Sequence, residues 1–142
     1  LVVAGDNLFD MELAPFIRAA KEKFPYASMM LYDVKDLNLA RQYGIVGLDG
    51  QNQIASFEEK PEHPTSTLSA MGVYFLPKAV LDKIDTYLKE GSPQDAPGFF
   101  IRWLYRREPV YGYPSEGVWY DIGDLGSYQE AQEAFQRARK DA

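Results

Sequence analysis

The stretch Leu1-Val2-Val3-Ala4-Gly5-Asp6-Asn7 places an apolar run directly before a polar turn. Four successive apolar residues followed by Gly-Asp-Asn predict a buried strand that ends at the turn. Open α/β sheets bind ligands at the carboxyl ends of their strands, which makes Asp6 a candidate binding residue. An ordinary Asx turn explains the same residues without a ligand, because Asp and Asn side chains readily bond nearby backbone.

Further strands and helices follow in a mixed order. Helical spacing of apolar residues predicts helices over residues 11–24, 77–88, 99–106 and 127–142. Apolar runs predict strands over residues 27–34, 68–76, 110–113 and 117–120. Residues 43–48 and 54–57 flank Asp49-Gly50, a pair that supplies the positive φ angles of a tight hairpin turn. This order predicts an α/β domain with parallel and antiparallel neighbours.

Composition argues against several classes of function. The formal net charge is −6 and the basic residues form no cluster, so a nucleic-acid partner is not expected. No apolar run reaches the roughly 18–20 residues of a membrane helix, so a membrane partner is not expected either. The sequence contains no cysteine, which excludes disulfides and thiolate metal sites and suits a cytoplasmic location.

The segment Ser56-Phe57-Glu58-Glu59-Lys60-Pro61 is the second candidate site. Alternate side chains of a strand point to opposite faces, so Glu59 can face a ligand while Glu58 faces solvent. Pro61 favours extended backbone at Lys60 and so limits where its ammonium points. A carboxylate beside an ammonium suits a sugar phosphate, since one accepts hydroxyl hydrogen bonds and the other binds phosphate. A charged edge that discourages sheet aggregation is the alternative.

The third candidate segment is Val118-Trp119-Tyr120-Asp121-Ile122-Gly123-Asp124. Asp121 stands among large apolar neighbours, where a carboxylate needs a partner such as a cation. Mg²⁺ prefers oxygen ligands, and Asp6 and Asp121 could supply a pair if folding brings them within about 8 Å of each other. Alternatively, Asp121 is a turn or N-cap carboxylate before the last helix.

These segments occur in a fixed order along nearly the whole chain. The Gly5-Asp6-Asn7 turn, Tyr43-Gly44-Ile45-Val46, Phe57-Glu58-Glu59-Lys60-Pro61, Gly72-Val73-Tyr74 and Trp119-Tyr120-Asp121-Ile122-Gly123 follow one another. In combination they resemble the sugar-1-phosphate nucleotidyltransferases, which include glucose-1-phosphate thymidylyltransferases and mannose-1-phosphate guanylyltransferases. The resemblance implies a mixed, mainly parallel Rossmann-like sheet flanked by helices. It also implies that residues 1–142 form one domain, the C-terminal, sugar-binding part of the enzyme, since the chain opens within a strand-like run.

The resemblance implies a role for each matching residue. Asp6 and Asp121 match the family's two Mg²⁺-binding aspartates, and Lys60 matches the lysine that contacts the sugar phosphate. In the same pocket, Gly44 lies against the sugar and Glu59 accepts its hydroxyl groups. Tyr74 falls on an aromatic position nearby. The implied catalytic residues are Asp6, Lys60 and Asp121, and the implied partners are a nucleoside triphosphate and a sugar-1-phosphate. A homo-oligomer is left open.

Two departures from the family pattern bear on function. The family's glycine-rich nucleotide loop, Gly-x-Gly-Thr-Arg-Leu, does not occur in these 142 residues. Such a loop binds phosphates through backbone N–H groups, so this chain by itself is expected to be inactive. Asp124 stands where the family commonly has Thr. A sugar-phosphate or nucleotide-sugar binding module with a regulatory, non-catalytic role therefore remains the alternative function.

Overall fold

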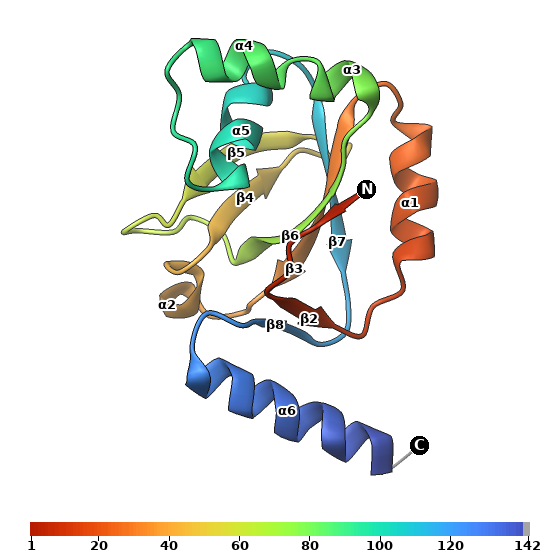
Figure 1. Cartoon of the computed structure of the whole chain (residues 1–142), viewed down its shortest axis with the longest axis vertical. Helices are drawn as coiled ribbons and strands as arrows, with labels where there is room; N and C mark the ends of the chain where they lie inside the picture. The colour runs from red at the N-terminus through yellow and green to blue at the C-terminus, as the bar shows by residue number, and fades with distance from the viewer. Residues whose placement is uncertain (141–142) are drawn as a thin grey trace.

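The structure, a computed structural model, describes the backbone of residues 1–140 and the side chains of residues 1–137. A mixed sheet forms its centre, as Figure 1 shows. The strand order is β5 (Ile54–Glu59), β4 (Gly44–Leu48), β6 (Leu68–Phe75), β3 (Ala27–Asp33) and β7 (Val110–Ser115). A short strand, β1 (Val2–Val3), also pairs with β6, and a separate ribbon joins β2 (Asn7–Phe9) to β8 (Trp119–Asp121).

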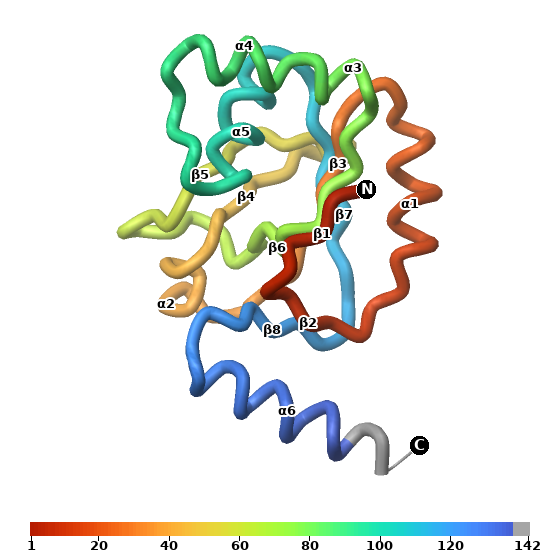
Figure 2. Tube along the Cα trace, in the orientation of Figure 1, coloured from red at the N-terminus to blue at the C-terminus, as the bar shows by residue number. Residues whose placement is uncertain are grey.

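Helices cover both faces of the central sheet, as the Cα trace in Figure 2 also shows. One face carries α1 (Leu13–Glu22) and the other carries α5 (Pro97–Leu104), with α3 (Lys78–Leu81) and α4 (Ile84–Lys89) beside it. The short α2 (Leu37–Ala40) precedes β4. The last helix, α6 (Leu125–Lys140), runs beside the β2–β8 ribbon and away from the central sheet. No helix in residues 1–140 has the length and apolarity needed to cross a membrane.

Two apolar layers form because the side chains of β3 alternate between the faces of the sheet. Met29 and Leu31 point to the layer that also contains Ile101 of α5. Met30 points to the opposite layer, where it meets Phe16 of α1. All five side chains are essentially buried. The predicted strand over residues 27–34 is thus confirmed, and the structure shows in addition that it is covered on both faces.

The mixed α/β fold is confirmed, but antiparallel pairs predominate in it. Among the described strands only β3 and β7 pair in parallel, whereas β6 runs antiparallel to β1, β3 and β4. The expected mainly parallel sheet is therefore wrong in its proportions. The physical reason is that β4 and β5 form a hairpin, and β3 and β7 are the strands joined by a long crossover, which is the connection that parallel pairing needs.

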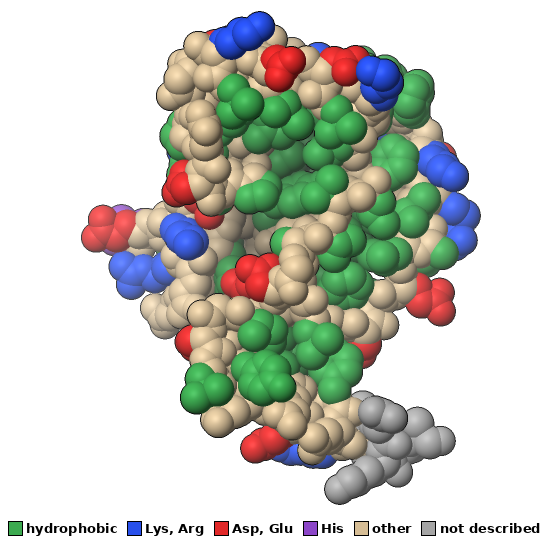
Figure 3. All heavy atoms as spheres, in the orientation of Figure 1, with side chains coloured by type: hydrophobic (Ala, Val, Ile, Leu, Met, Phe, Trp, Pro, Cys, Tyr) green, Lys and Arg blue, Asp and Glu red, His purple; other side chains and the backbone are tan. Residues whose placement is uncertain are grey.

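The first strand differs from the expected buried strand. Val2 and Val3 are 44% and 43% exposed, and the only strand that pairs with them within residues 1–140 is β6. In the same orientation as Figure 1, Figure 3 shows a broad band of hydrophobic side chains on the viewed face of the molecule. An apolar run alone therefore predicted a strand correctly but did not predict its burial.

Two local predictions need correction. The expected helix over residues 77–88 is divided into α3 and α4, because the N–H of Lys83 bonds the carbonyl of Val80, three residues back, and tightens the chain. The 43–57 hairpin forms as predicted, but its positive φ of 61° falls on Asn52 rather than on Asp49-Gly50. Asp49 instead accepts two backbone hydrogen bonds inside the turn.

The remaining boundaries agree closely with the sequence. Residues 11–24, 68–76, 99–106, 110–113 and 117–120 correspond to α1, β6, α5, β7 and β8. The last two residues of the expected helix 127–142 lie outside the described part of the chain. Two short elements, β2 and α2, were not predicted, because three- and four-residue segments carry no readable periodicity.

Candidate functional site

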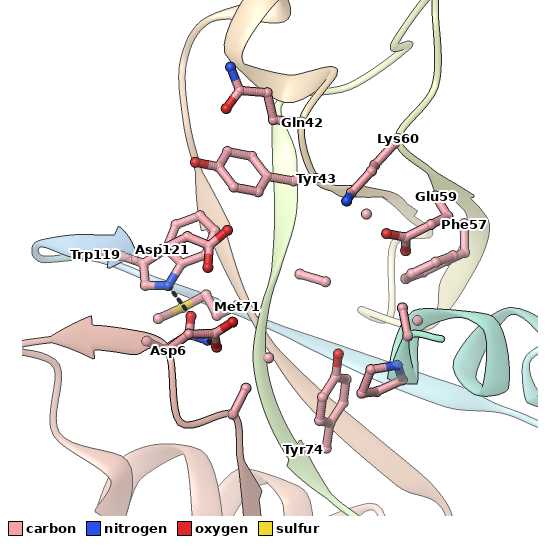
Figure 4. Close-up of a pocket in the computed structure, with 18 residues that line it drawn as sticks. Asp6, Gln42, Tyr43, Phe57, Glu59, Lys60, Met71, Tyr74, Trp119 and Asp121 are labelled. Carbon is pink, nitrogen blue, oxygen red and sulfur yellow. Dashed lines mark hydrogen bonds between the residues drawn. The ribbon is translucent and has the colours of Figure 1, made fainter. Parts of the chain in front are cut away.

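A pocket of about 200 Å³ lies between the β2–β8 ribbon, the β4–β5 hairpin, β6 and the start of α5. Figure 4 shows the side chains that line it. All candidate residues identified from the sequence line this one pocket: Asp6, Gly44, Glu59, Lys60, Tyr74 and Asp121. The fold thus brings together residues from separate segments that the sequence only showed in order.

Asp6 and Asp121 meet because the two ends of the chain pair in the β2–β8 ribbon. Asn7 lies opposite Asp121 in this antiparallel pair, and the N–H of Ile122 donates to the carbonyl of Asp6 at 2.8 Å. Figure 4 shows the two carboxylates next to each other at one end of the pocket. The expected approach of these residues therefore has a backbone cause.

The electrostatics of this carboxylate pair suit a cation. Burial raises the pKa of Asp121, the negative charge of Asp6 raises it further, and the ammonium of Lys60 partly opposes both effects. Two oxygen donors whose charges repel each other fit Mg²⁺, which often takes one or two carboxylates and completes its shell with water and substrate phosphate. Within the described residues no cluster of three or more His, Cys, Asp or Glu side chains could hold a metal. Asp6 and Asp121 are therefore the neighbouring pair of carboxylates that this pocket offers to a cation.

Asn7 connects Asp6 to Trp119 and was not identified as a site residue from the sequence. The indole Nε1–H of Trp119 donates to Asn7 Oδ1 at 2.6 Å, and Asn7 Nδ2 donates to Asp6 Oδ1 at 2.9 Å. The indole packs against Tyr32 and Tyr43, whose ring centroids lie 5.6 and 5.0 Å away. These contacts orient one carboxylate oxygen of Asp6.

Gly72 makes room for this arrangement. Its φ is +72°, a conformation that L side chains rarely adopt. A Cβ at this position would lie 3.0 Å from both Ala4 Cβ and Asn7 Nδ2. Glycine is therefore required both by the backbone angle and by the close approach of the first turn to β6.

The carboxylate of Glu59 is held between two glycines. Gly44 lies opposite Glu59 in the β4–β5 pair, and a Cβ on Gly44 would lie 3.1 Å from Glu59 Oε2. A Cβ on Gly98, at the start of α5, would clash with the same oxygen. Glu58, one residue earlier, is exposed, so the predicted opposite facing of the two glutamates is confirmed.

Glu59 has a perturbed acidity as a result. Burial raises its pKa; the neighbouring Lys60 opposes this shift, Asp95 adds to it and Arg102 opposes it. An ionised carboxylate in a partly buried pocket gains from hydroxyl donors, because these replace the water it has lost. The geometry therefore suits a ligand that carries several hydroxyl groups.

Lys60 is exposed at the rim of the pocket, as expected of an ammonium without a buried partner. Figure 4 shows its amine directed into the cavity on the same side as Glu59. Pro61 had suggested an extended backbone at Lys60. This prediction is wrong, because the φ of Lys60 is +46°. The N–H of Lys60 bonds the carbonyl of Tyr43 at 3.0 Å, and this tertiary bond prevails over the local preference of a residue before proline.

Two tyrosines complete the lining. Tyr74 is 5% exposed, and burial together with the charge of Glu59 raises its pKa to about 12. Its hydroxyl therefore stays protonated and can donate a hydrogen bond at neutral pH. Burial and the charge of Asp121 also raise the pKa of Tyr43, a pocket residue to which the sequence assigned no role.

The structure also decides the alternative interpretation of Asp121. The residue that caps α6 is Asp124: its Oδ1 accepts from the N–H of Ser127 at 2.8 Å, and its own N–H donates to Ser127 Oγ at 3.2 Å. Asp121 lies in β8 and lines the pocket. A helix cap therefore explains the departure at Asp124, and it leaves Asp121 free for a ligand.

Comparison with known proteins places the chain in a family. The family described as nucleotidyl transferase matches residues 1–138. A glucose-1-phosphate adenylyltransferase of Thermomicrobium roseum is 32% identical over 95% of this chain and 32% of its own length. Another from Lachnospira eligens is 31% identical over 92% of this chain and 31% of its own length. The solved structure of a UDP-glucose pyrophosphorylase complexed with UDP-glucose superposes with a TM-score of 0.74 at 21% identity.

This chain belongs to the nucleotidyl transferase family, whose relatives here are sugar-1-phosphate nucleotidyltransferases. It spans about a third of the length of the curated relatives. The superposition covers 96% of this chain and 55% of the UDP-glucose pyrophosphorylase chain, and it identifies the fold. The family assignment from the ordered motifs is thereby confirmed.

Proposed function

We propose that this chain supplies the sugar-phosphate and metal side of a cytoplasmic enzyme that transfers a nucleotidyl group from a nucleoside triphosphate to a sugar-1-phosphate. The products are a nucleoside diphosphate sugar and pyrophosphate. An oxygen of the sugar phosphate forms a bond to the α-phosphorus, and the bond from that phosphorus to the β-phosphate bridging oxygen breaks. The electron pair of the broken bond leaves with pyrophosphate. No covalent bond to the enzyme is required.

The observation that carries this proposal is the convergence of a carboxylate pair, Asp6 and Asp121, with Glu59 and Lys60 in one pocket. Figure 4 shows the carboxylate pair at one end of the pocket and Glu59 with Lys60 at the other. A sugar-1-phosphate offers hydroxyl groups for Glu59 and a phosphate for Lys60 and for a cation held by the carboxylate pair. The family membership supports the same chemistry.

Each residue then has one task. Glu59 accepts hydrogen bonds from sugar hydroxyl groups, Tyr74 donates one, and the lack of a side chain at Gly44 lets the sugar approach the backbone. Lys60 pairs with the sugar phosphate and orients its oxygen. When bound at Asp6 and Asp121, Mg²⁺ supplies charge neutralisation for the reacting phosphates. Catalysis by this chain is positioning and electrostatic stabilisation.

Binding of glucose-1-phosphate in the presence of Mg²⁺, measured by calorimetry, tests the proposal. Lys60→Gln should weaken binding about tenfold or more, the loss expected for one charge-assisted hydrogen bond. Lys35→Gln is a matched control, because Lys35 is also an exposed lysine with a positive φ, of 58°, but does not line this pocket. Equal binding by Lys60→Gln and Lys35→Gln would contradict the assignment.

A non-catalytic sugar-phosphate binding module is the second candidate, since the glycine-rich loop does not occur in these 142 residues. Pyrophosphate release separates the two functions. The intact protein should release pyrophosphate from a nucleoside triphosphate only when a sugar-1-phosphate and Mg²⁺ are present, and residues 1–142 alone should not. Tight glucose-1-phosphate binding without pyrophosphate release by the intact protein would favour the regulatory module.

A further inference from the structure

A second pocket, of about 150 Å³, lies along α5 and the loop that precedes it, and it shares no lining residue with the first pocket. Three arginines line it, Arg102, Arg106 and Arg107, together with the aromatic rings of Phe99 and Trp103. In a chain whose net charge is −6, such a local group of cations is unusual. Neither the family motifs nor the proposed reaction uses any of these residues.

The aromatic rings hold the guanidinium groups by their faces. Arg102 lies over the ring of Phe99 at 5.3 Å, and Arg107 lies over the ring of Trp103 at 4.2 Å. Stacking occupies the face of a guanidinium but leaves its in-plane N–H groups able to donate. Arg106 follows Arg102 by four residues, one helical turn, and lies 5.9 Å from the ring of Tyr105.

Two of the three arginines form no ion pair with the described side chains. Arg107 pairs with Glu90 at 3.0 Å, and the indole N–H of Trp103 donates to the same carboxylate oxygen. Within residues 1–137 neither Arg102 nor Arg106 has a carboxylate within 4.0 Å. Two further acids, Asp95 and Glu59, lie near Arg102. Burial and then the charge of Asp95 raise the pKa of Tyr87, a residue of the pocket wall, whereas Arg102 lowers it. Burial also raises the pKa of Glu59 in the first pocket, and Arg102 opposes that shift.

We propose that this second pocket binds a phosphoryl group. The two unpaired guanidinium groups of Arg102 and Arg106 match the charge of a phosphate, about −1.5 to −2 at neutral pH, and their planar donor edges match its oxygens. A volume of about 150 Å³ has room for one small anion. Free phosphate and a phosphate monoester share this chemistry.

The second pocket is connected to the first through the segment between α4 and α5. Ser92 and Pro93 line the second pocket, while Ala96, Pro97 and Gly98 line the first. The hydroxyl of Tyr87 donates to the carbonyl of Pro93 and ties this segment to α4. Arg102 lies on the same helix as Pro97 and Gly98, which line the first pocket.

The two tryptophans of the chain allow each pocket to be observed separately. Trp103 lines the second pocket and Trp119 lines the first, and the sequence contains no other tryptophan. In ¹⁵N-labelled protein each gives one indole N–H signal. Inorganic phosphate is titrated against sodium chloride of equal ionic strength. We expect a saturable shift of the Trp103 signal with phosphate only, because Trp103 shares Glu90 with Arg107.

Variants assign the shift to the arginines. Arg102→Gln combined with Arg106→Gln should weaken phosphate binding at least tenfold. Arg18→Gln is the control and should leave binding unchanged, because Arg18 is an exposed residue of α1, on the other face of the sheet. If the double variant does not fold, Arg106→Gln is tested alone, because Arg106 is exposed, and a smaller loss of phosphate affinity is expected. Acetate, with one charge, should bind more weakly than phosphate.

This test is separate from that of the proposed function. Glucose-1-phosphate binding in the first pocket is followed by the indole signal of Trp119, and phosphate binding in the second pocket by that of Trp103. A stronger response to glycerol phosphate than to inorganic phosphate identifies a monoester as the source, and an equal response identifies free phosphate. The proposal is overturned by equal shifts in sodium chloride, by equal binding of acetate, by a phosphate shift at Trp119 only, or by full binding in the arginine variants.

Discussion

Gly44 lies directly opposite Glu59 in the β4–β5 pair, and the carboxylate of Glu59 occupies the space that a side chain at residue 44 would need. Gly98 of α5 approaches the same carboxylate from a different element. The carboxylate of Glu59 thus fills a space that exists because residues 44 and 98 are both glycines. This makes the pocket sensitive to the smallest additions of volume.

Gly44→Ala should weaken glucose-1-phosphate binding about tenfold while leaving the fold intact. The new Cβ would lie 2.9 Å from Cζ of the buried Phe57 and 3.1 Å from Oε2 of Glu59, so one of them must move. Gly50→Ala is the control, because a Cβ there meets nothing within 4 Å. Calorimetric binding with a thermal unfolding scan measures both effects, and unchanged affinity in Gly44→Ala would refute the prediction.

Gly72→Ala should destabilise the protein more than Gly91→Ala does. Both glycines have a φ of +72°, which by itself costs an alanine roughly 1–2 kcal/mol. At Gly72 the Cβ would also press on Ala4 and Asn7, whereas at Gly91 it meets nothing within 4 Å. Urea unfolding of the two variants isolates the contact contribution as their difference. Equal losses of stability in the two variants would contradict the prediction, because they would show that Ala4 and Asn7 can move aside with no loss of free energy of unfolding.

Glu59→Gln should stabilise the ligand-free protein at pH 7. Folding raises the pKa of Glu59, so the native state binds this proton more tightly than the unfolded chain does. The contribution of Glu59 to stability is therefore complete below its unfolded pKa, about 4.3, and is lost as the pH rises through the folded pKa. The gain in Glu59→Gln should thus disappear near pH 4.

Urea unfolding at both pH values measures this dependence. Glu58→Gln provides the comparison, since Glu58 is exposed on the same strand and its replacement should change stability little at either pH. A Glu59→Gln protein that is less stable than the wild type at pH 7 would mean that the carboxylate is satisfied by partners inside the fold.

Asp121→Asn should raise the thermal stability of the metal-free protein and abolish its stabilisation by Mg²⁺. Removing one of two neighbouring negative charges relieves their repulsion and leaves a single carboxylate for the cation. Asp85→Asn makes the same change in net charge on the exposed surface of α4 and should retain the Mg²⁺ response. A Mg²⁺-dependent shift that persists in Asp121→Asn would place the cation elsewhere.

Much of the local structure was readable from the sequence. Apolar runs and turn residues predicted the β4–β5 hairpin and β3, and helical spacing predicted α1. The candidate residues were also named, because short ordered motifs carry side chains whose chemistry suits sugar, phosphate and metal. Where the prediction was wrong, backbone hydrogen bonds prevailed over sequence preference: a bond between Lys83 and Val80 breaks the 77–88 helix, and a bond to Tyr43, which directly precedes the neighbouring strand β4, accompanies the positive φ of Lys60.

By itself the sequence determined which side chains are available and which face of each strand they occupy, because these depend on composition and on a period of two residues. Only the tertiary structure decided that Asn7 joins Trp119 to Asp6, that Gly98 completes the cradle of Glu59, and that three arginines share a second pocket. The physical reason is that these relations depend on strand pairing and helix packing between distant segments. No local spacing encodes the free energy of those contacts.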